Sequence, residues 1–131
     1  METREPLKCN MRLRFQNHDK GTMIYTVHDE IGRGRLCIAY EASYINNVGI
    51  SKKVFIKECY PFKLRICRDE NGRLIPDESD SEKFYAYKKY FQESFEINNT
   101  LFEISGLSNF IVNFIDLYEA NNTLYIVSSY L

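Results

Sequence analysis

The sequence predicts an α+β domain in which a five-stranded antiparallel sheet packs against one long helix. Three apolar segments joined by short turns occupy residues 25–58, and consecutive strands of this kind form an antiparallel meander. Residues 84–102 then repeat apolar side chains at a spacing of about 3.6 residues, with no internal glycine or proline. Two further apolar segments, 111–118 and 124–131, complete the order β-β-β-α-β-β.

The three strands of the meander are expected at residues 25–31, 36–44 and 53–58. The turn between the first two contains a pair of glycines, and an Asn-Asn-Val-Gly turn separates the second from the third. Pro61 ends the third strand, because proline has no N–H to donate to a ladder. These turns set the antiparallel order of the strands.

Residues 1–24 are expected to be an N-terminal flank to a domain that spans residues 25–131. Within the flank, residues 11–15 alternate apolar and basic side chains, as a half-buried strand does. We therefore expect an extra strand at the edge of the sheet.

The connection from residue 60 to residue 83 is long, and it carries a turn signal of its own. Asn71-Gly72 lies between two short apolar runs, a pattern that predicts an inserted hairpin. Acidic and serine side chains at 77–82 then precede the aromatic run, as expected at the start of a helix.

Composition favours a single cytoplasmic domain. The 131 residues carry a net charge of −1, which does not indicate a nucleic-acid-binding surface. The four cysteines show no Cys-x-x-Cys spacing and only two histidines accompany them, so we expect reduced thiols and no metal site. We also expect no membrane-spanning segment and no secretion signal.

Two motifs point toward a nucleotide. Gly32 and Gly34 form a Gly-x-Gly turn between strands, and Lys57 stands alone in the apolar run Val-Phe-Ile-Lys. Each motif alone is weak, because most such glycine pairs are simple turns. Together, in this order and about 25 residues apart, they match the glycine-rich loop and the phosphate-binding lysine of protein kinases.

The stretch from about Lys20 to Leu131 resembles the amino-terminal, ATP-binding lobe of a protein kinase, and is most similar to the bacterial eukaryotic-like serine/threonine kinases. Residues 37–42, Cys-Ile-Ala-Tyr-Glu-Ala, resemble the strand that follows the glycine loop. Residues 56–61, Ile-Lys-Glu-Cys-Tyr-Pro, resemble the lysine strand. Residues 112–131 resemble the family's fourth and fifth strands running into the interlobe hinge.

This resemblance implies a transferase that moves a phosphoryl group from ATP to protein Ser or Thr, with Mg²⁺ as cofactor. It implies that Lys57 contacts the α- and β-phosphates and that a helix glutamate holds Lys57. We expect Glu93 in that role, and Glu96 is the alternative. The residues expected to bind ATP are Ile31, Gly32, Arg33, Gly34, Ala39, Phe55, Lys57, Ser128, Ser129 and Leu131.

Two departures from the family pattern raise a second hypothesis. Ala39 replaces the valine that usually covers the adenine, and Phe55 replaces the small residue that faces it. Strand alternation places Phe55 on the same face as Lys57, so its ring enters the expected cleft. The chain would then be a pseudokinase-like interaction module with an occluded nucleotide site. Alternatively, the ring leans toward the back of the pocket, where Ser128 leaves space.

The catalytic base and the magnesium-binding aspartate of protein kinases belong to a second lobe that these 131 residues do not contain. We therefore expect a fragment that does not transfer phosphate alone. In the longer protein, ATP and a protein substrate are the expected partners. An isolated lobe exposes an aromatic-rich face, so we also expect self-association.

Overall fold

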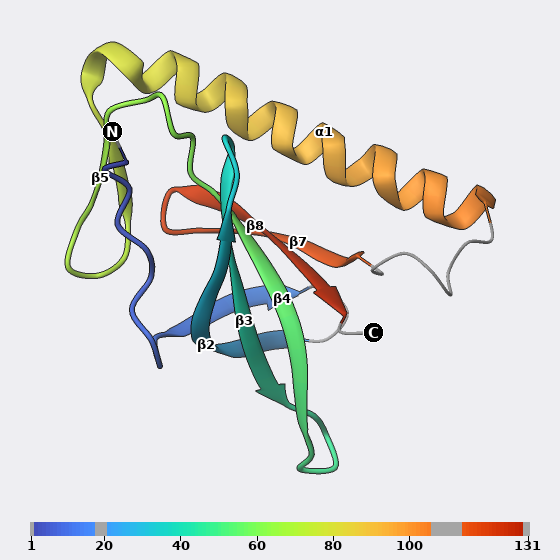
Figure 1. Cartoon of the computed structure of the whole chain (residues 1–131). Coiled ribbons are helices and arrows are strands. Elements are labelled where there is room, and N and C mark those ends of the chain that lie inside the picture. Colours follow the sequence, from blue (N-terminus) through green and yellow to red (C-terminus); the bar gives the residue numbers. More distant parts are fainter. Residues whose placement is uncertain (1, 18–20, 106–113, 130–131) are drawn as a thin grey trace.

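The computed structural model describes residues 2–17, 21–105 and 114–129. Within these residues one sheet dominates, and a single α-helix lies across it (Figure 1). In chain order the elements are β1 (Arg12–Asn17), β2 (Gly21–Arg33), β3 (Cys37–Ile45), β4 (Ser51–Cys59), β5 (Ile66–Arg68), β6 (Leu74–Pro76), a 3-10 turn (Glu78–Asp80), α1 (Ser81–Ser105), β7 (Phe114–Ala120) and β8 (Thr123–Ser129).

The predicted fold class, a five-stranded sheet with one long helix as in a kinase amino-terminal lobe, is wrong. The sheet has six antiparallel strands in the order β1-β2-β3-β4-β8-β7, and it curls into a nearly closed, barrel-like form. The difference arises at the N-terminus. The N-terminal flank supplies β1, at the place of the expected extra strand, and β1 brings one edge of the sheet round to the other.

Side chains bring the two edges of the sheet together. The Phe15 ring of β1 stacks on the Tyr118 ring of β7, with centroids 4.5 Å apart and planes 7° apart. Beside them, the Asn17 side-chain amide donates to the Tyr118 hydroxyl (3.2 Å) and to Asp116 (3.3 Å). The closure therefore rests on one aromatic stack and a small polar cluster.

The curvature comes from β2, which pairs with β1 along its first half and with β3 along its second. Its register with β3 shifts twice, between Val27 and Glu30 and between Glu30 and Gly32. Such irregularities increase the local twist of a strand. Figure 1 shows β2 turning sharply between these two halves.

The inner face of the curled sheet holds most of the core. Alternate residues of each strand point inward, and large rings fill the space, because Phe15, Tyr25, Tyr40 and Tyr125 are all at most 1% exposed. The outer face of β4, β8 and β7 is covered by α1, and Phe84 and Phe91 are the buried residues among 81–96 of this helix. The contacts of α1 with the sheet lie mainly on these three strands.

Closure of the sheet predicts the effect of removing one aromatic side chain. Phe15→Ala removes a ring that is 1% exposed and contacts three other rings. We expect it to lower the free energy of unfolding by about 3–5 kcal/mol, measured by urea denaturation. Tyr85→Ala, at a position 68% exposed on α1, is the aromatic control and should change it by less than about 0.5 kcal/mol. Equal losses in the two variants would contradict closure through Phe15.

Candidate functional site

Three of the predicted site residues lie in one row across the sheet. Gly32 of β2 is opposite Ala39 of β3, and Ala39 is opposite Lys57 of β4. Residues directly opposite one another point their side chains to the same face. The row therefore places a glycine, an alanine and an exposed lysine side by side on the outer face of the sheet.

Phe55 and Ser128 lie one step along from this row, on the same face. Phe55 pairs with Ser128 of β8, and the Phe55 side chain is half-buried. Ser129 pairs with Val54, so it points to the opposite face. Leu131 lies outside the described residues. The structure therefore brings Ala39, Phe55, Lys57 and Ser128 together and separates Ser129 from them.

The turn that follows β2, residues 33–37, is held firmly by backbone hydrogen bonds. The Gly34 amide donates to the Cys37 carbonyl (2.9 Å). The Leu36 and Arg35 carbonyls accept from the amides of Tyr60 and Phe62, both at 2.8 Å. We call residues 33–37 the glycine turn. Its carbonyl groups are engaged with neighbouring chain, so it is a fixed hairpin end.

The fold itself does not require glycine at positions 32 and 34. Neither residue has a positive φ, and a Cβ built on either would meet no atom within 4 Å. Gly72, in contrast, has φ +92° and would place a Cβ against the Met11 side chain. Glycine in a strand weakens it, because it offers no side chain to pack. The space that a Cβ would occupy is open at both glycines, although the amide and carbonyl of Gly34 are already hydrogen-bonded to Cys37 and Arg4.

An N-terminal strap, residues 2–7, lies against the glycine turn. The Arg4 guanidinium donates through Nη1 to the carbonyl of Gly34 and to that of Tyr60, both at 2.8 Å. Arg4 is 7% exposed, and Glu2 forms an ion pair with it at 2.8 Å. Arg33 completes the contact by donating to the Arg4 carbonyl at 3.0 Å. Sequence reasoning missed the strap, because no periodic pattern marks it.

Ile31 and Arg33 flank the row without joining it. Ile31 is 50% exposed at the end of β2. Arg33 forms ion pairs with Glu30 (2.6 Å) and Glu2 (3.3 Å), so its charge is already opposed by two carboxylates. These pairs raise the pKa of Arg33 and lower that of Glu30. Arg33 therefore helps to hold the strap against the glycine turn.

Glu93 is placed on the solvent side of α1. Successive helical residues are about 100° apart, so Glu93 lies about 200° around the helix from the buried Phe91. Glu93 is exposed and borders a shallow depression with Glu119 and Leu124. Glu96, the alternative, is also exposed and accepts from Gln92 at 3.4 Å. The structure shows no ion pair between Glu93 and Lys57.

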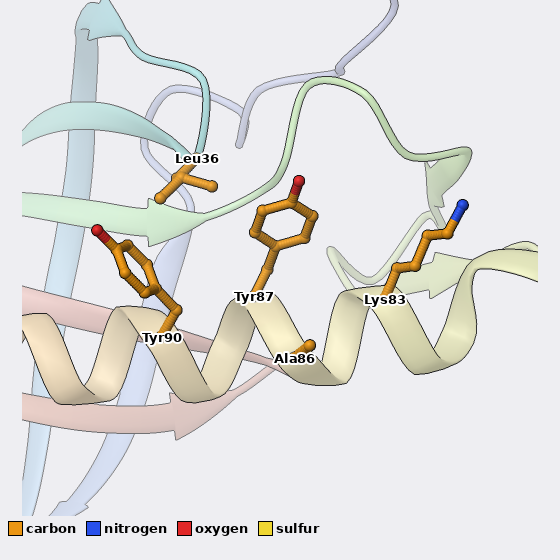
Figure 2. Close-up of a pocket in the computed structure, with 5 residues that line it drawn as sticks. All are labelled: Leu36, Lys83, Ala86, Tyr87 and Tyr90. Atoms are coloured by element: carbon orange, nitrogen blue, oxygen red, sulfur yellow. The ribbon is translucent and has the colours of Figure 1, made fainter.

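A cavity of about 430 Å³ separates the glycine turn from α1. Figure 2 shows Leu36 of the turn facing the rings of Tyr87 and Tyr90, with Ala86 and Lys83 further along the helix. Its lining is largely apolar. One cation, Lys83, lies at its end.

The residue after Lys57 belongs to a buried polar network that sequence reasoning also missed. Glu58 is fully buried, and both of its carboxylate oxygens accept from the Arg68 guanidinium. Tyr125 donates its hydroxyl to Glu58 at 2.6 Å, and Tyr40 does so at 3.3 Å. Alternation from the apolar Ile56 would have placed Glu58 inward, which was the available signal. This network is structural and lies on the face opposite Lys57.

Electrostatics connect Lys57 to the glycine turn. Burial raises the pKa of the Cys37 thiol, and the neighbouring Lys57 ammonium acts in the opposite direction. Because Cys37 is the last residue of the glycine turn, the charge of Lys57 acts on the end of this turn. Burial also raises the pKa of Cys59 to about 12, which makes that thiol unreactive near neutral pH.

Residues 2–17, 21–105 and 114–129 show neither a clustered metal site nor a membrane-spanning helix. They contain no group of three or more His, Cys, Asp or Glu side chains arranged to hold a metal ion. Their one α-helix is not apolar enough over a sufficient length to cross a membrane.

Comparison with known proteins finds no protein-family model, no curated protein and no solved structure that matches this chain significantly. The resemblance to protein kinases therefore rests on the motifs of the sequence.

The strap predicts a titration in acid. The hydrogen bond from Arg4 lowers the pKa of the Glu2 carboxyl from 4.5 to about 2. The stabilisation of the strap by Glu2 is therefore complete above pH 4.5 and is lost as pH falls toward 2. Carboxyl NMR should give a Glu2 midpoint near 2 and, in Arg4→Ala, one close to the ordinary value. An ordinary midpoint in the unaltered chain would contradict the contact.

Proposed function

We propose that this chain binds the phosphates of ATP between Lys57 and the glycine turn, as the ATP-binding part of a serine/threonine protein kinase. The observation that supports this most is the row Gly32, Ala39 and Lys57 across three strands. Adjacent strands are about 4.8 Å apart, so Gly32 and Lys57 are roughly 10 Å apart across the row. A lysine side chain spans much of that distance, which leaves room for a phosphate between its ammonium and the turn.

The chemistry of the row fits a polyphosphate. Lys57 is an exposed cation in the same row as Gly32, whose Cβ position is open. A lysine is a point charge that suits phosphate oxygens, and the missing side chain of Gly32 leaves room for them next to the sheet. Ala39, between them, is small and half-buried, so it does not block the approach.

The same proposal covers the longer protein. The residues that act as base and hold Mg²⁺ would lie outside these 131 residues, so the chain alone would bind ATP without transferring phosphate. A protein substrate carrying Ser or Thr, a cytoplasmic location, and self-association of the isolated chain are further parts of it.

A second candidate function is favoured by Phe55. Its ring is half-buried on the outer face, one step from Lys57 and opposite the buried Ser128. A ring in that place fills space that an adenine would need. The strap also holds the carbonyl side of the glycine turn. The chain would then be a non-catalytic interaction module.

A matched pair of lysines on β4 tests the first proposal. Lys53 and Lys57 are exposed on the same face of β4, and Lys53 lies within 4.0 Å of Glu41. Calorimetry with Mg-ATP should show that Lys57→Ala weakens binding about tenfold or more, the loss of one charge-assisted contact. Lys53→Ala should stay within about twofold.

The two candidate functions separate in the same titration. If Phe55 occludes the site, the unaltered chain gives no heat with Mg-ATP and Phe55→Ala restores binding. If neither chain binds, or if both lysine variants lose affinity equally, the phosphate site proposed at Lys57 is wrong.

Gly34→Ala should affect stability and binding in opposite directions. Its φ is not positive and its Cβ position is open, so alanine restricts the unfolded chain at no steric cost in the fold. We expect the free energy of unfolding to rise by about 0.4–1 kcal/mol, in urea denaturation. Mg-ATP binding should weaken, because the new methyl group occupies the approach to the turn. Unchanged affinity would mean that the glycine has no role in binding.

A further inference from the structure

A cleft opens where β2 and β3 separate. Their ladder ends at the pair Thr26 and Ser43, although β2 begins at Gly21 and β3 continues to Ile45. Figure 1 shows the first half of β2 running away with β1, while the β3–β4 hairpin extends beyond the sheet. The cleft between them has a volume of about 870 Å³ and is lined from both strands.

The backbone of β2 presents unpaired groups to this cleft. The Val27 amide donates to Met11 (2.8 Å) and the Val27 carbonyl accepts from Asn10 (2.7 Å), so Val27 faces β1. Hydrogen-bonding direction alternates along a strand. The N–H and C=O groups of Thr22 and Ile24 therefore face the cleft, where no described strand pairs with them.

The edge of β3 is open in the same way. The Asn46 amide donates to the Ile50 carbonyl across the hairpin at 2.9 Å, so Asn46 faces β4. Ile45, one residue earlier, faces the cleft. Two strand edges with free hydrogen-bonding groups thus border one space.

Apolar side chains gather beside these edges. Ile24 is 42% exposed and Ile45 is 67% exposed, and they occupy equivalent positions on the outer face. The hairpin tip adds Val48 and Ile50, both largely exposed. The Asn46 side chain accepts from both of their amides, which holds the tip in one conformation.

The charge at the cleft is positive. Arg12 of β1 lines it, and no carboxylate is among its lining residues. Arg12 also begins a row across the sheet through Thr26 and Ser43 to Lys53. A ligand with a negatively charged side chain near Arg12 is therefore favoured.

We propose that this cleft binds an extended peptide of a partner protein, which adds as a strand between β2 and β3. Its backbone pairs with Thr22, Ile24 and Ile45, its apolar side chains contact Ile24 and Ile45, and a carboxylate meets Arg12. A second copy of this chain is a poorer occupant. Its own sheet edges, β1 and β7, contact each other, β5 and β6 have only three residues each, and its own copy of the cleft carries the same positive charge. This proposal is independent of ATP binding.

The test begins with selection of a phage-displayed random decapeptide library on the full chain, followed by NMR with the enriched peptide. We expect apolar or β-branched residues at alternate positions and at least one Asp or Glu. Bound peptide should slow hydrogen exchange at the amides of Thr22, Ile24 and Ile45. This measurement uses the unaltered chain, so it does not depend on the folding of any variant.

Two substitutions sharpen the test. Ile24→Pro removes an N–H that faces the cleft and leaves the β1 ladder intact, so it should weaken peptide binding about tenfold or more. Arg12→Glu should weaken binding of the acidic peptide about tenfold, whereas Lys89→Glu on the exposed side of α1 should stay within about twofold. Thermal unfolding checks that each variant is folded.

Three results would overturn the proposal. One is a selection that yields no binding peptide, and another is a peptide that leaves those three amides exchanging freely. The third is protection of the amides that rises with protein concentration alone, which would assign the cleft to a second copy.

Discussion

The buried ion pair between Glu58 and Arg68 is the interaction on which the N-terminal half of the structure depends. Moving two charges out of water is costly, and removing either partner leaves an uncompensated buried charge. Both groups are therefore surrounded by partners. Arg68 donates to the carbonyls of Glu5 and Gly72 as well as to Glu58. The pair thus joins β4, the strap and the β5–β6 hairpin.

This network sits directly behind the proposed phosphate site. Lys57 and Glu58 are neighbours in β4, and alternation sends their side chains to opposite faces of the sheet. Glu58 fixes β4 from within, through two tyrosine hydroxyls and Arg68. The position of Lys57 is consequently set by a rigid, fully hydrogen-bonded core, while its ammonium faces outward. A scaffold of this kind suits a charged group that must be held in place.

Local signals in the sequence were sufficient for much of the secondary structure. The periodic run 84–102 lies within α1, and Asn71-Gly72 stands between β5 and β6. The way the sheet closes was not predictable from such signals. Alternation in residues 11–15 indicates a half-buried strand, but it cannot show that Phe15 meets Tyr118, more than a hundred residues later. Local pattern identifies a strand, and only tertiary contact decides where it lies.

In the candidate site too, local pattern placed some residues correctly and could not place others. The alternation of side chains along a strand has a short, regular period. It was therefore possible to place Lys57, Ala39 and Phe55 on one face from the sequence. Glu93 was chosen from the resemblance to the helix of protein kinases, although the helical positions of Phe84 and Phe91 direct it outward. Arg4 could not be found, since its partners are main-chain carbonyls of Gly34 and Tyr60. Backbone acceptors leave no trace in sequence.

Closure through β1 also sets an order of events during synthesis. The Asn17 amide and its Tyr118 hydroxyl partner are separated by 101 residues. At roughly 5–20 residues per second, a ribosome needs on the order of 5–20 seconds to make the intervening chain. During that time β1 has no opposite edge to meet, and its apolar face is uncovered. Of the strands of this sheet, β1 is synthesised before the others but completes the sheet last. Until β7 emerges, pairing with β2 and two charged arginine side chains in β1 keep this strand soluble.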